Sequence, residues 1–268
     1  MAEKKHLTAA VIDIGSNAMR MKIAQRRGDD IDVIENVEYP VNFGDDTFSR
    51  GVISFSEGAS AAKVLQDMVA LARQYEVEPE NMRITATTAL REAQNSPYVA
   101  DRMQIACGID IDILSDVEEK ALIFCDLLRR LHNENVLGDK TFMMAYIGTA
   151  SLGVAIVTGG NIIYYRNIKT GTLIIAQMLD DMRRSRADLH SVLEDYMESL
   201  LYELRAQIRK YRVDGFVVCG KEISQIAQIV LGHTARRIEK IKKSDTVQLY
   251  NSIKSLSQGE IAYRFRLR

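Results

Sequence analysis

The chain has 268 residues, of which 47% are hydrophobic and only 3 are proline, so it can form a sizeable core and is not a disordered protein. Its formal net charge is −1, so the chain lacks the overall positive charge typical of proteins that bind nucleic acid or membrane surfaces. Any site for a polyanion must therefore be local. The N-terminus lacks a secretory pattern, no apolar run reaches membrane-spanning length, and the three cysteines lack metal-ligand spacing. We therefore expect a cytoplasmic protein with free thiols.

The first segment predicts three consecutive strands. Residues 9–15, "AAVIDIG", are apolar enough for a buried central strand. Residues 18–27 alternate between hydrophobic and basic side chains, which is typical of a strand with one wetter face. After a Gly-Asp turn, residues 31–41 continue as a third strand.

Helices and short strands alternate through the rest of the first half. Residues 42–54 predict a loop, and the spacing of Ser54 and Glu57 predicts a capping box that begins the next helix. The other predicted elements are a strand at 82–86, a helix at 89–94, a strand at 109–115 and a helix at 117–131. This alternation indicates an α/β fold.

The opening pattern repeats after a polar loop at residues 132–140. The predicted strands of the second half lie at 141–148, 151–158, 161–168 and 215–220, the last of them buried, and its helices at 173–184, 189–211 and 222–231. Because both halves begin with three strands, the repeat predicts two duplicated α/β domains, residues 1–134 and 135–268.

A glycine lies at the first hairpin turn of each half, Gly15 in one and Gly148 in the other. Backbone N–H groups in such turns form anion-binding nests, and glycine allows a phosphate to approach closely. Ligands also bind preferentially between domains. The sequence therefore predicts a phosphate-binding cleft between the two domains, without naming the substrate.

Four blocks in order carry a resemblance to a known family: "AVIDIGSNAMRMKIA", "VNFGDDTFSRGVIS", "ITATTALREAQN" and "ILSDVEEKALI". Together they resemble the exopolyphosphatase and guanosine-pentaphosphate phosphohydrolase (Ppx/GppA) family, within the actin, hexokinase and heat-shock ATPase superfamily. The resemblance covers nearly the whole chain and is stronger in the first half. It implies two actin-like, ribonuclease H-like α/β domains.

By this resemblance, the first phosphate loop consists of Asp13, Gly15, Ser16, Asn17 and Arg20. Asp13 would hold Mg²⁺, directly or through water, and Arg20 would contact phosphate oxygens. The simpler alternative is that Asp13 caps the turn and Arg20 is a solvated strand residue. An acid followed by small and polar residues at the end of one strand rarely serves packing alone, which favours the functional interpretation.

Thr87 and Arg91 lie in the block "ITATTALREAQN", the third of the four, and are implied to bind phosphate. A guanidinium at the start of a helix can form a forked contact with a terminal phosphate, and the helix N-terminus also attracts anions. The alternative for Arg91 is an ion pair with Glu92 or a neighbouring carboxylate. We favour phosphate binding.

The two adjacent glutamates of "SDVEEK" have different expected roles. Ser115 and Glu118 have capping-box spacing, so Glu118 is expected to close the box. Glu119 corresponds to the family's catalytic glutamate, which would orient and deprotonate the water that attacks the terminal phosphorus. The alternative for Glu119 is an acid in the first helical turn, stabilised by the helix dipole. Lys120 departs from the alanine that is usual in the family.

The second phosphate loop departs further from the family pattern. The resemblance implies phosphate contacts from Gly148 and Ser151, but Tyr146 and Gly153 replace the two acids that the family uses for the divalent metal. A tyrosine hydroxyl can donate to phosphate but holds Mg²⁺ poorly at neutral pH. The chain also stops where the family usually continues into a last strand, so we interpret the second domain as truncated at its end.

The leading hypothesis is a hydrolase that releases terminal phosphate from inorganic polyphosphate or guanosine pentaphosphate with Mg²⁺. The alternative is a catalytically degenerate relative that binds polyphosphate or an alarmone nucleotide as a regulator, which the Tyr146 and Gly153 replacements favour. An ATP-driven kinase or chaperone of the wider superfamily is a weaker third hypothesis. We expect no membrane or nucleic-acid partner and allow for a homodimer.

Overall fold

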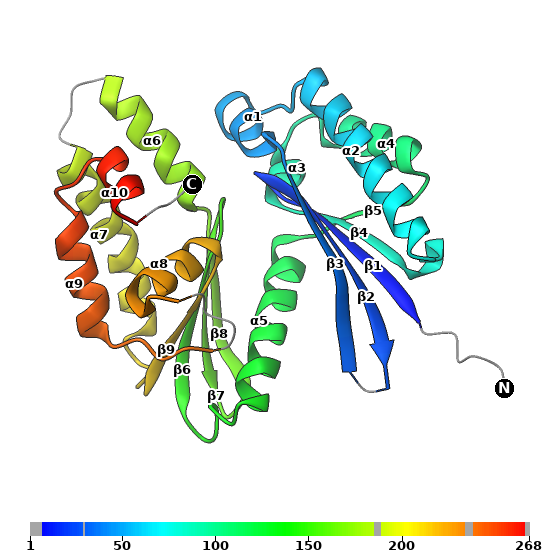
Figure 1. The fold of residues 1–268 in the computed structure, drawn as a ribbon. Helices are drawn as coiled ribbons and strands as arrows, with labels where there is room; N and C mark the ends of the chain where they lie inside the picture. The colour runs from blue at the N-terminus through cyan, green and yellow to red at the C-terminus, as the bar shows by residue number, and fades with distance from the viewer. Residues whose placement is uncertain (1–6, 29, 185–188, 234–237, 266–268) are drawn as a thin grey trace. The chain divides into compact units, whose positions relative to one another are not determined.

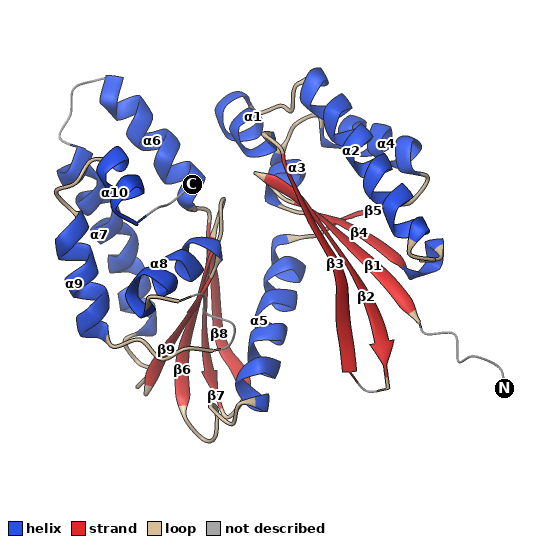
Figure 2. Cartoon of the chain, in the orientation of Figure 1, coloured by secondary structure: helices blue, strands red, loops and turns tan. Residues whose placement is uncertain are grey.

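The structure is a computed structural model that describes residues 7–28, 30–184, 189–233 and 238–265. It contains two sheets, drawn in red in Figure 2, with helices beside each of them. By their contacts, residues 1–123 and 169–197 form unit 1, and residues 124–168 and 198–268 form unit 2. In the described part of the chain, no helix combines the length and apolar character needed to cross a membrane. The predicted domain boundary after residue 134 stays a prediction.

Unit 1 is built on a five-stranded sheet with the order β3-β2-β1-β4-β5 (Figure 1). Its strands are β1 (Thr8–Ile14), β2 (Ala18–Arg27), β3 (Asp30–Pro40), β4 (Met82–Ala86) and β5 (Ile111–Ile113). The first three strands are antiparallel neighbours, whereas β4 runs parallel to both β1 and β5. The chain therefore places the ends of β1 and β4 at the same edge of the sheet.

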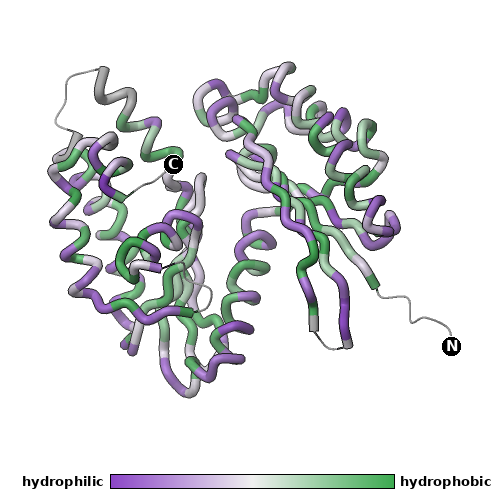
Figure 3. Tube along the Cα trace, viewed as in Figure 1, coloured by the Kyte–Doolittle hydropathy of each residue, from purple (hydrophilic) through white to green (hydrophobic). Residues whose placement is uncertain are grey.

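The alternation predicted for β2 is confirmed by burial. Met19, Met21 and Ile23 are fully buried, whereas Lys22 is exposed. The buried side chains belong to the core that packs beneath α2 (Phe55–Gln74) and α4 (Ser96–Cys107), which lie side by side in Figure 1. In Figure 3 hydrophobic segments run along the strands of both sheets. Periodicity thus gave the correct core face.

Two helices of unit 1 were not predicted. The segment expected to be a loop contains α1 (Phe43–Arg50), and α4 follows the short helix α3 (Thr88–Glu92) directly. Phe43 is fully buried, so tertiary packing stabilises a helix whose sequence is rich in turn-forming residues. The other elements of this half are the short 3₁₀ turn η1 (Pro79–Asn81) and α5 (Asp116–Asn133), which continues into unit 2.

The predicted capping box at Ser54 is half correct. The Glu57 N–H donates to Ser54 Oγ at 3.4 Å, as expected for a cap. The Glu57 carboxylate, however, accepts from the Asn42 N–H at 2.7 Å, and the Ser54 N–H donates to Asp46 instead. Glu57 therefore ties the start of α2 to the chain before α1, a long-range contact that the spacing alone does not reveal.

Unit 2 repeats the strand pattern of unit 1, as the sequence predicted. Its sheet has the order β8-β7-β6-β9, with strands β6 (Thr141–Ile147), β7 (Leu152–Thr158), β8 (Asn161–Ile168) and β9 (Gly215–Cys219). As in unit 1, the first strand is antiparallel to the second and parallel to the fourth. The remaining helices of unit 2 are α8 (Lys221–Leu231), α9 (Lys243–Ile253), α10 (Gln258–Phe265) and the second part of α7 (Leu189–Ile208). The first part of α7 and α6 (Thr172–Arg184) belong to unit 1.

The burial of β9 differs from the prediction of a buried strand. Phe216 is 71% exposed and Val218 is 52% exposed, whereas Val217 packs against the core of the unit. Phe216 and Val218 alternate with Val217 along β9, so they lie together on the exposed face of this edge strand. The three cysteines are free, as predicted; Cys107 is buried, Cys125 is exposed and Cys219 is partly buried.

Candidate functional site

The predicted first phosphate loop is the turn between β1 and β2. The Gly15 N–H donates to the Ala18 carbonyl at 3.0 Å, which closes the turn. The Thr87 N–H donates to the Ile14 carbonyl at 3.1 Å, so the residue that follows β4 is bonded to the start of the loop. A Cβ at Gly15 would lie 3.0 Å from the Ala18 carbonyl oxygen. A side chain at Gly15 would crowd this backbone oxygen, so the tight turn favours glycine here.

Ser16 and Asn17 are held by backbone contacts with the entry to α1. The Gly44 N–H donates to the Ser16 carbonyl at 2.8 Å, and the Val41 N–H donates to the Asn17 carbonyl at 3.1 Å. A Cβ at Gly44 would approach Ser16 Cβ at 3.1 Å and Asn17 Oδ1 at 3.2 Å. Gly44 thus shapes the loop, a role that the sequence signalled only through its place in the second block of the resemblance.

Asp13 and Arg20 are directly opposite each other in the β1–β2 pair. Arg20 Nη1 lies 3.7 Å from Asp13 Oδ2, and Arg20 Nε donates to Glu38 Oε2 at 3.3 Å. Arg20 is therefore a cross-strand cation between two carboxylates, with 38% of its side chain exposed. Arg20 Nη1 would lie 3.5 Å from a Cβ at Gly15, so the guanidinium lies beside the loop.

The Asp13 carboxyl titrates abnormally. Surrounding protein atoms bury it and raise its pKa above the ordinary value, although 41% of its side chain is open to solvent. Arg20 lowers the pKa and the charge of Glu119 raises it, so burial and Glu119 together outweigh Arg20. The effect of Glu119 shows that the first loop and the predicted base share one electrostatic environment within unit 1.

Replacing Asp13 with asparagine is expected to stabilise the fold at neutral pH. Because the folded-state pKa is raised, the folded chain binds the proton more tightly, and stability falls as pH rises through that pKa. Asparagine does not ionise, so the Asp13→Asn variant should not lose this folding free energy at neutral pH. We expect the difference to be less than about 1 kcal/mol because the Asp13 side chain is partly exposed. Urea unfolding at pH 7 and near pH 4 measures it; the gain should shrink at the lower pH. A variant less stable than wild type at pH 7 would instead show that the Arg20 pair dominates.

Arg91 lies at the centre of a polar network. Its Nη1 donates to the Leu114 carbonyl at 2.6 Å and to Glu119 Oε2 at 3.3 Å, and its Nη2 donates to Thr88 Oγ1 at 3.1 Å. The guanidinium also lies 3.5 Å from Asp116 and 3.8 Å from Glu92. Much of its N–H capacity is thus used within the protein, closer to the ion-pair alternative than to an open phosphate fork. Phosphate binding by Arg91 and Thr87 stays a prediction.

The two adjacent glutamates of α5 differ as predicted. The Ser115 N–H donates to Glu118 Oε2 at 2.9 Å and the Glu118 N–H donates to Ser115 Oγ at 3.3 Å, so the capping box is confirmed. The box holds the pKa of Glu118 below its ordinary value. Glu119 takes no part in this box, and only 12% of its side chain is exposed. Its two oxygens contact Lys120 at 2.6 Å and Arg91 at 3.3 Å.

The second predicted loop lies in unit 2, between β6 and β7. The Gly148 N–H donates to the Ser151 carbonyl at 2.9 Å, and Ser151 is buried. Tyr146 and Gly153, which replace the family's two acids, are direct cross-strand partners. The Tyr146 ring packs against the core of the unit, and its Cε1 would lie 2.8 Å from a Cβ at Gly148. An aromatic ring therefore fills the neighbourhood where the family has carboxylates.

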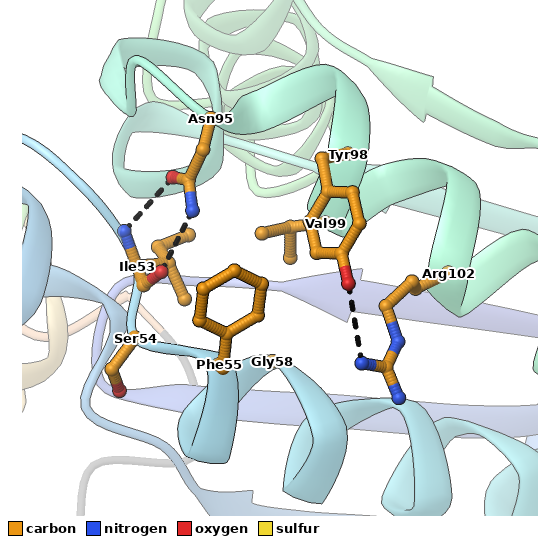
Figure 4. A pocket seen from close by; sticks show the side chains of 8 residues that line it. All are labelled: Ile53, Ser54, Phe55, Gly58, Asn95, Tyr98, Val99 and Arg102. Atoms are coloured by element: carbon orange, nitrogen blue, oxygen red, sulfur yellow. Dashed lines mark hydrogen bonds between the residues drawn. The ribbon is translucent and has the colours of Figure 1, made fainter.

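A small surface pocket lies beside the second block of the resemblance, between α2 and α4 (Figure 4). The Asn95 amide donates to the Ile53 carbonyl at 2.7 Å and accepts from the Ile53 N–H at 3.0 Å. The rings of Phe55 and Tyr98 meet edge to face, with centroids 5.5 Å apart. Asn95 therefore joins two segments of unit 1, and its contacts are structural.

The model of the Ppx/GppA phosphatase family matches residues 22–264, which is most of the chain. The chain belongs to the Ppx/GppA phosphatase family. A comparison with curated protein sequences gives no significant match.

Solved structures agree with this Ppx/GppA membership. The Ppx/GppA family member from Aquifex aeolicus has a TM-score of 0.75 at 18% identity, over 97% of this chain and 83% of that one. An exopolyphosphatase from Cytophaga hutchinsonii has a TM-score of 0.79 at 18% identity, over 95% and 82%. A PilM–PilN type IV pilus biogenesis complex reaches 0.50 at 13% identity, over 84% and 86%. These likenesses establish the fold: two duplicated actin-like α/β domains.

The Mg²⁺ expected of a Ppx/GppA protein was tested against the donors present. Among residues 7–28, 30–184, 189–233 and 238–265, no group of three or more His, Cys, Asp or Glu side chains is arranged to hold a metal ion. Asp13 faces Arg20, and both Glu119 oxygens face cations. Mg²⁺ is usually held by one or two carboxylates, with waters and substrate phosphates completing its shell of about six oxygen ligands. Because a protein cation already lies beside each of the two carboxylates, the described donors do not fit the ion.

The predicted site residues fall into two groups. Asp13, the Gly15–Asn17 turn, Arg20, Thr87, Arg91 and Glu119 belong to unit 1, whereas Gly148 and Ser151 belong to unit 2. Sequence analysis missed two residues that shape the unit 1 site, Gly44 and Lys120. The sequence does show that Lys120 replaces the alanine usual in the family. Only the structure shows that this lysine is buried against Glu119.

Proposed function

We propose that this Ppx/GppA protein hydrolyses the terminal phosphoanhydride bond of inorganic polyphosphate or guanosine pentaphosphate. Family membership supports the reaction class. The observation that supports it most is that adjacent residues join the first loop to the candidate base: the Thr87 N–H donates to the Ile14 carbonyl at 3.1 Å, and Thr88 Oγ1 donates to Glu119 Oε2 at 3.4 Å. A base beside a phosphate loop is what attack by water on a terminal phosphate requires.

Each residue of unit 1 has a role in this proposal. Arg20 and the N–H groups of the Gly15–Asn17 turn bind the terminal phosphate. Glu119 orients a water molecule and accepts its proton as the water oxygen bonds to phosphorus. The bond between phosphorus and the bridging oxygen breaks, and the shortened chain leaves with the negative charge. Contacts from Gly148 and Ser151 stay a prediction from the resemblance.

Mg²⁺ would neutralise charge on the phosphates if it were bound, with Asp13 as the expected ligand. Because the described donors do not fit the ion, no step of the proposed reaction is assigned to it. The cations that the chain itself offers to the phosphates are Arg20 and Arg91, both in unit 1.

A second candidate function is binding without turnover, as a sensor of polyphosphate or guanosine pentaphosphate. The observation in its favour is the direct pairing of Tyr146 with Gly153, where the family has two acids. Losing both removes negative charge that would position a metal, while the backbone turn at Gly148 remains. Such a protein would bind the same phosphates and release none.

One assay separates these functions. Orthophosphate release and ligand binding are measured with the wild-type chain on long-chain polyphosphate, guanosine pentaphosphate and ATP, with and without Mg²⁺. The proposed hydrolase releases phosphate from one of the first two ligands and not from ATP. Tight binding with no release under any condition would favour the sensor, and binding of ATP alone would revive the kinase or chaperone hypothesis.

A further inference from the structure

A lysine ammonium is buried beside the candidate base. Lys120 lies in the first turns of α5, and only 1% of its side chain is exposed. Its Nζ lies 2.6 Å from Glu119 Oε1 and 3.9 Å from Asp116 Oδ1. Burying an ammonium is costly unless a carboxylate compensates its charge, so this ion pair is a defined part of the fold.

The other oxygen of Glu119 is occupied as well. Arg91 Nη1 donates to Glu119 Oε2 at 3.3 Å, and Thr88 Oγ1 donates to the same oxygen at 3.4 Å. Each oxygen of the carboxylate therefore has its own cation. A divalent ion on either oxygen would lie beside an ammonium or a guanidinium, and like charges at such short range repel strongly in a shielded site.

Fixed cations recur at the other acid of the site. Asp13 faces Arg20 at 3.7 Å across the β1–β2 pair. In the second loop, Tyr146 and Gly153 provide no carboxylate at all. Of the acids that the resemblance assigns to the metal, Asp13 therefore lies next to a protein cation, and the two of the second loop are absent.

We propose that Lys120 is a built-in cation that replaces a divalent metal at Glu119, so that the unit 1 site binds no Mg²⁺-like ion there. Lys120 is a positioning residue, because its buried ammonium acts through Glu119 and does not reach substrate. The exclusion of a divalent ion from Glu119 by Lys120 does not depend on whether the chain hydrolyses phosphate. Together with the proposed function, this exclusion implies that Arg20 and Arg91 neutralise the charge of the phosphate.

Mn²⁺ binding tests this without any substrate. Free Mn²⁺ is followed by electron paramagnetic resonance during titration of the full-length wild type, Lys120→Met and the control Lys63→Met, which changes an exposed lysine of α2. Removing the ammonium frees one oxygen of Glu119, so we expect Lys120→Met to bind Mn²⁺ at least about tenfold more tightly than wild type. The control should match wild type, and adding Glu119→Gln to Lys120→Met should abolish the gain.

Two results would overturn the proposal. One is wild-type Mn²⁺ binding that Glu119→Gln removes, because the metal would then share Glu119 with Lys120. The other is a folded Lys120→Met variant with unchanged affinity. If circular dichroism shows that Lys120→Met does not fold, Lys120→Gln makes the same test, since it keeps a donor for Glu119 without the charge. The experiment measures Mn²⁺ binding and not phosphate release. Its result therefore tests the role of Lys120 even if the chain does not hydrolyse phosphate.

Discussion

Replacing Gly220 with alanine is expected to cost more than about 3 kcal/mol of folding free energy, a loss typical of severe backbone clashes. A Cβ at this position would lie 2.2 Å from the Ile147 carbonyl oxygen, which is a backbone atom and cannot rotate away. The Gly220 φ of +144° is also one that side chains disfavour. Urea unfolding monitored by circular dichroism measures the loss.

We expect the Gly220→Ala substitution also to displace the second predicted phosphate loop. Ile147 is the last residue of β6 and directly precedes Gly148, so a shift of its carbonyl displaces the turn that is closed by the Gly148–Ser151 hydrogen bond. Gly259→Ala is the matched control: it lies in α10 with open space around it. It should be neutral or stabilising by up to about 1 kcal/mol, because alanine favours helix. Equal unfolding curves for both variants would show that β9 and β6 do not meet this closely.

Replacing Glu119 with glutamine is expected to lower the rate of phosphate release by about 10²–10⁴-fold, the usual contribution of a general base. Glutamine keeps the size of the side chain and one oxygen but cannot accept a proton from water. Glu118→Gln is the matched control, since glutamine also closes a capping box. We expect it to keep the wild-type rate. Orthophosphate release from polyphosphate under identical conditions measures all three chains.

A structural loss must be separated from the catalytic one. Glu119→Gln leaves the Lys120 ammonium without its nearest carboxylate, and a buried charge that loses its partner destabilises a fold. The double variant Glu119→Gln/Lys120→Met removes both charges, so it should regain stability while turnover stays absent. Recovery of turnover in the double variant would show that Glu119 serves only to compensate Lys120.

Local chemistry was predictable from the sequence wherever it depended on neighbouring residues. The alternation that buries Met19 and Met21 and the Ser115–Glu118 capping box both depend on fixed local spacing, and both are confirmed. The repeat of three strands was visible for the same reason, since each hairpin is a local unit.

Features set by long-range contacts were not predictable. Whether Glu57 turns to Ser54 or to Asn42 depends on the path of α1, which tertiary packing stabilises. Likewise, a lysine near the start of a helix is usually solvated, and only the surrounding fold makes Lys120 a buried partner of Glu119. The sequence predicts candidate site residues in unit 1, but it does not show which protein groups contact them.

The central claim is that the β1–β2 loop binds the terminal phosphate, and a polyphosphate titration in the presence of EDTA tests it most directly. Arg20→Met should weaken binding about tenfold or more, because a charge-assisted contact to phosphate is lost. Arg26→Met, on the same strand with its Nε bonded to the Gly28 carbonyl at 2.9 Å, should bind like wild type. Equal affinities for wild type and both variants would contradict the account and place the phosphate away from this loop.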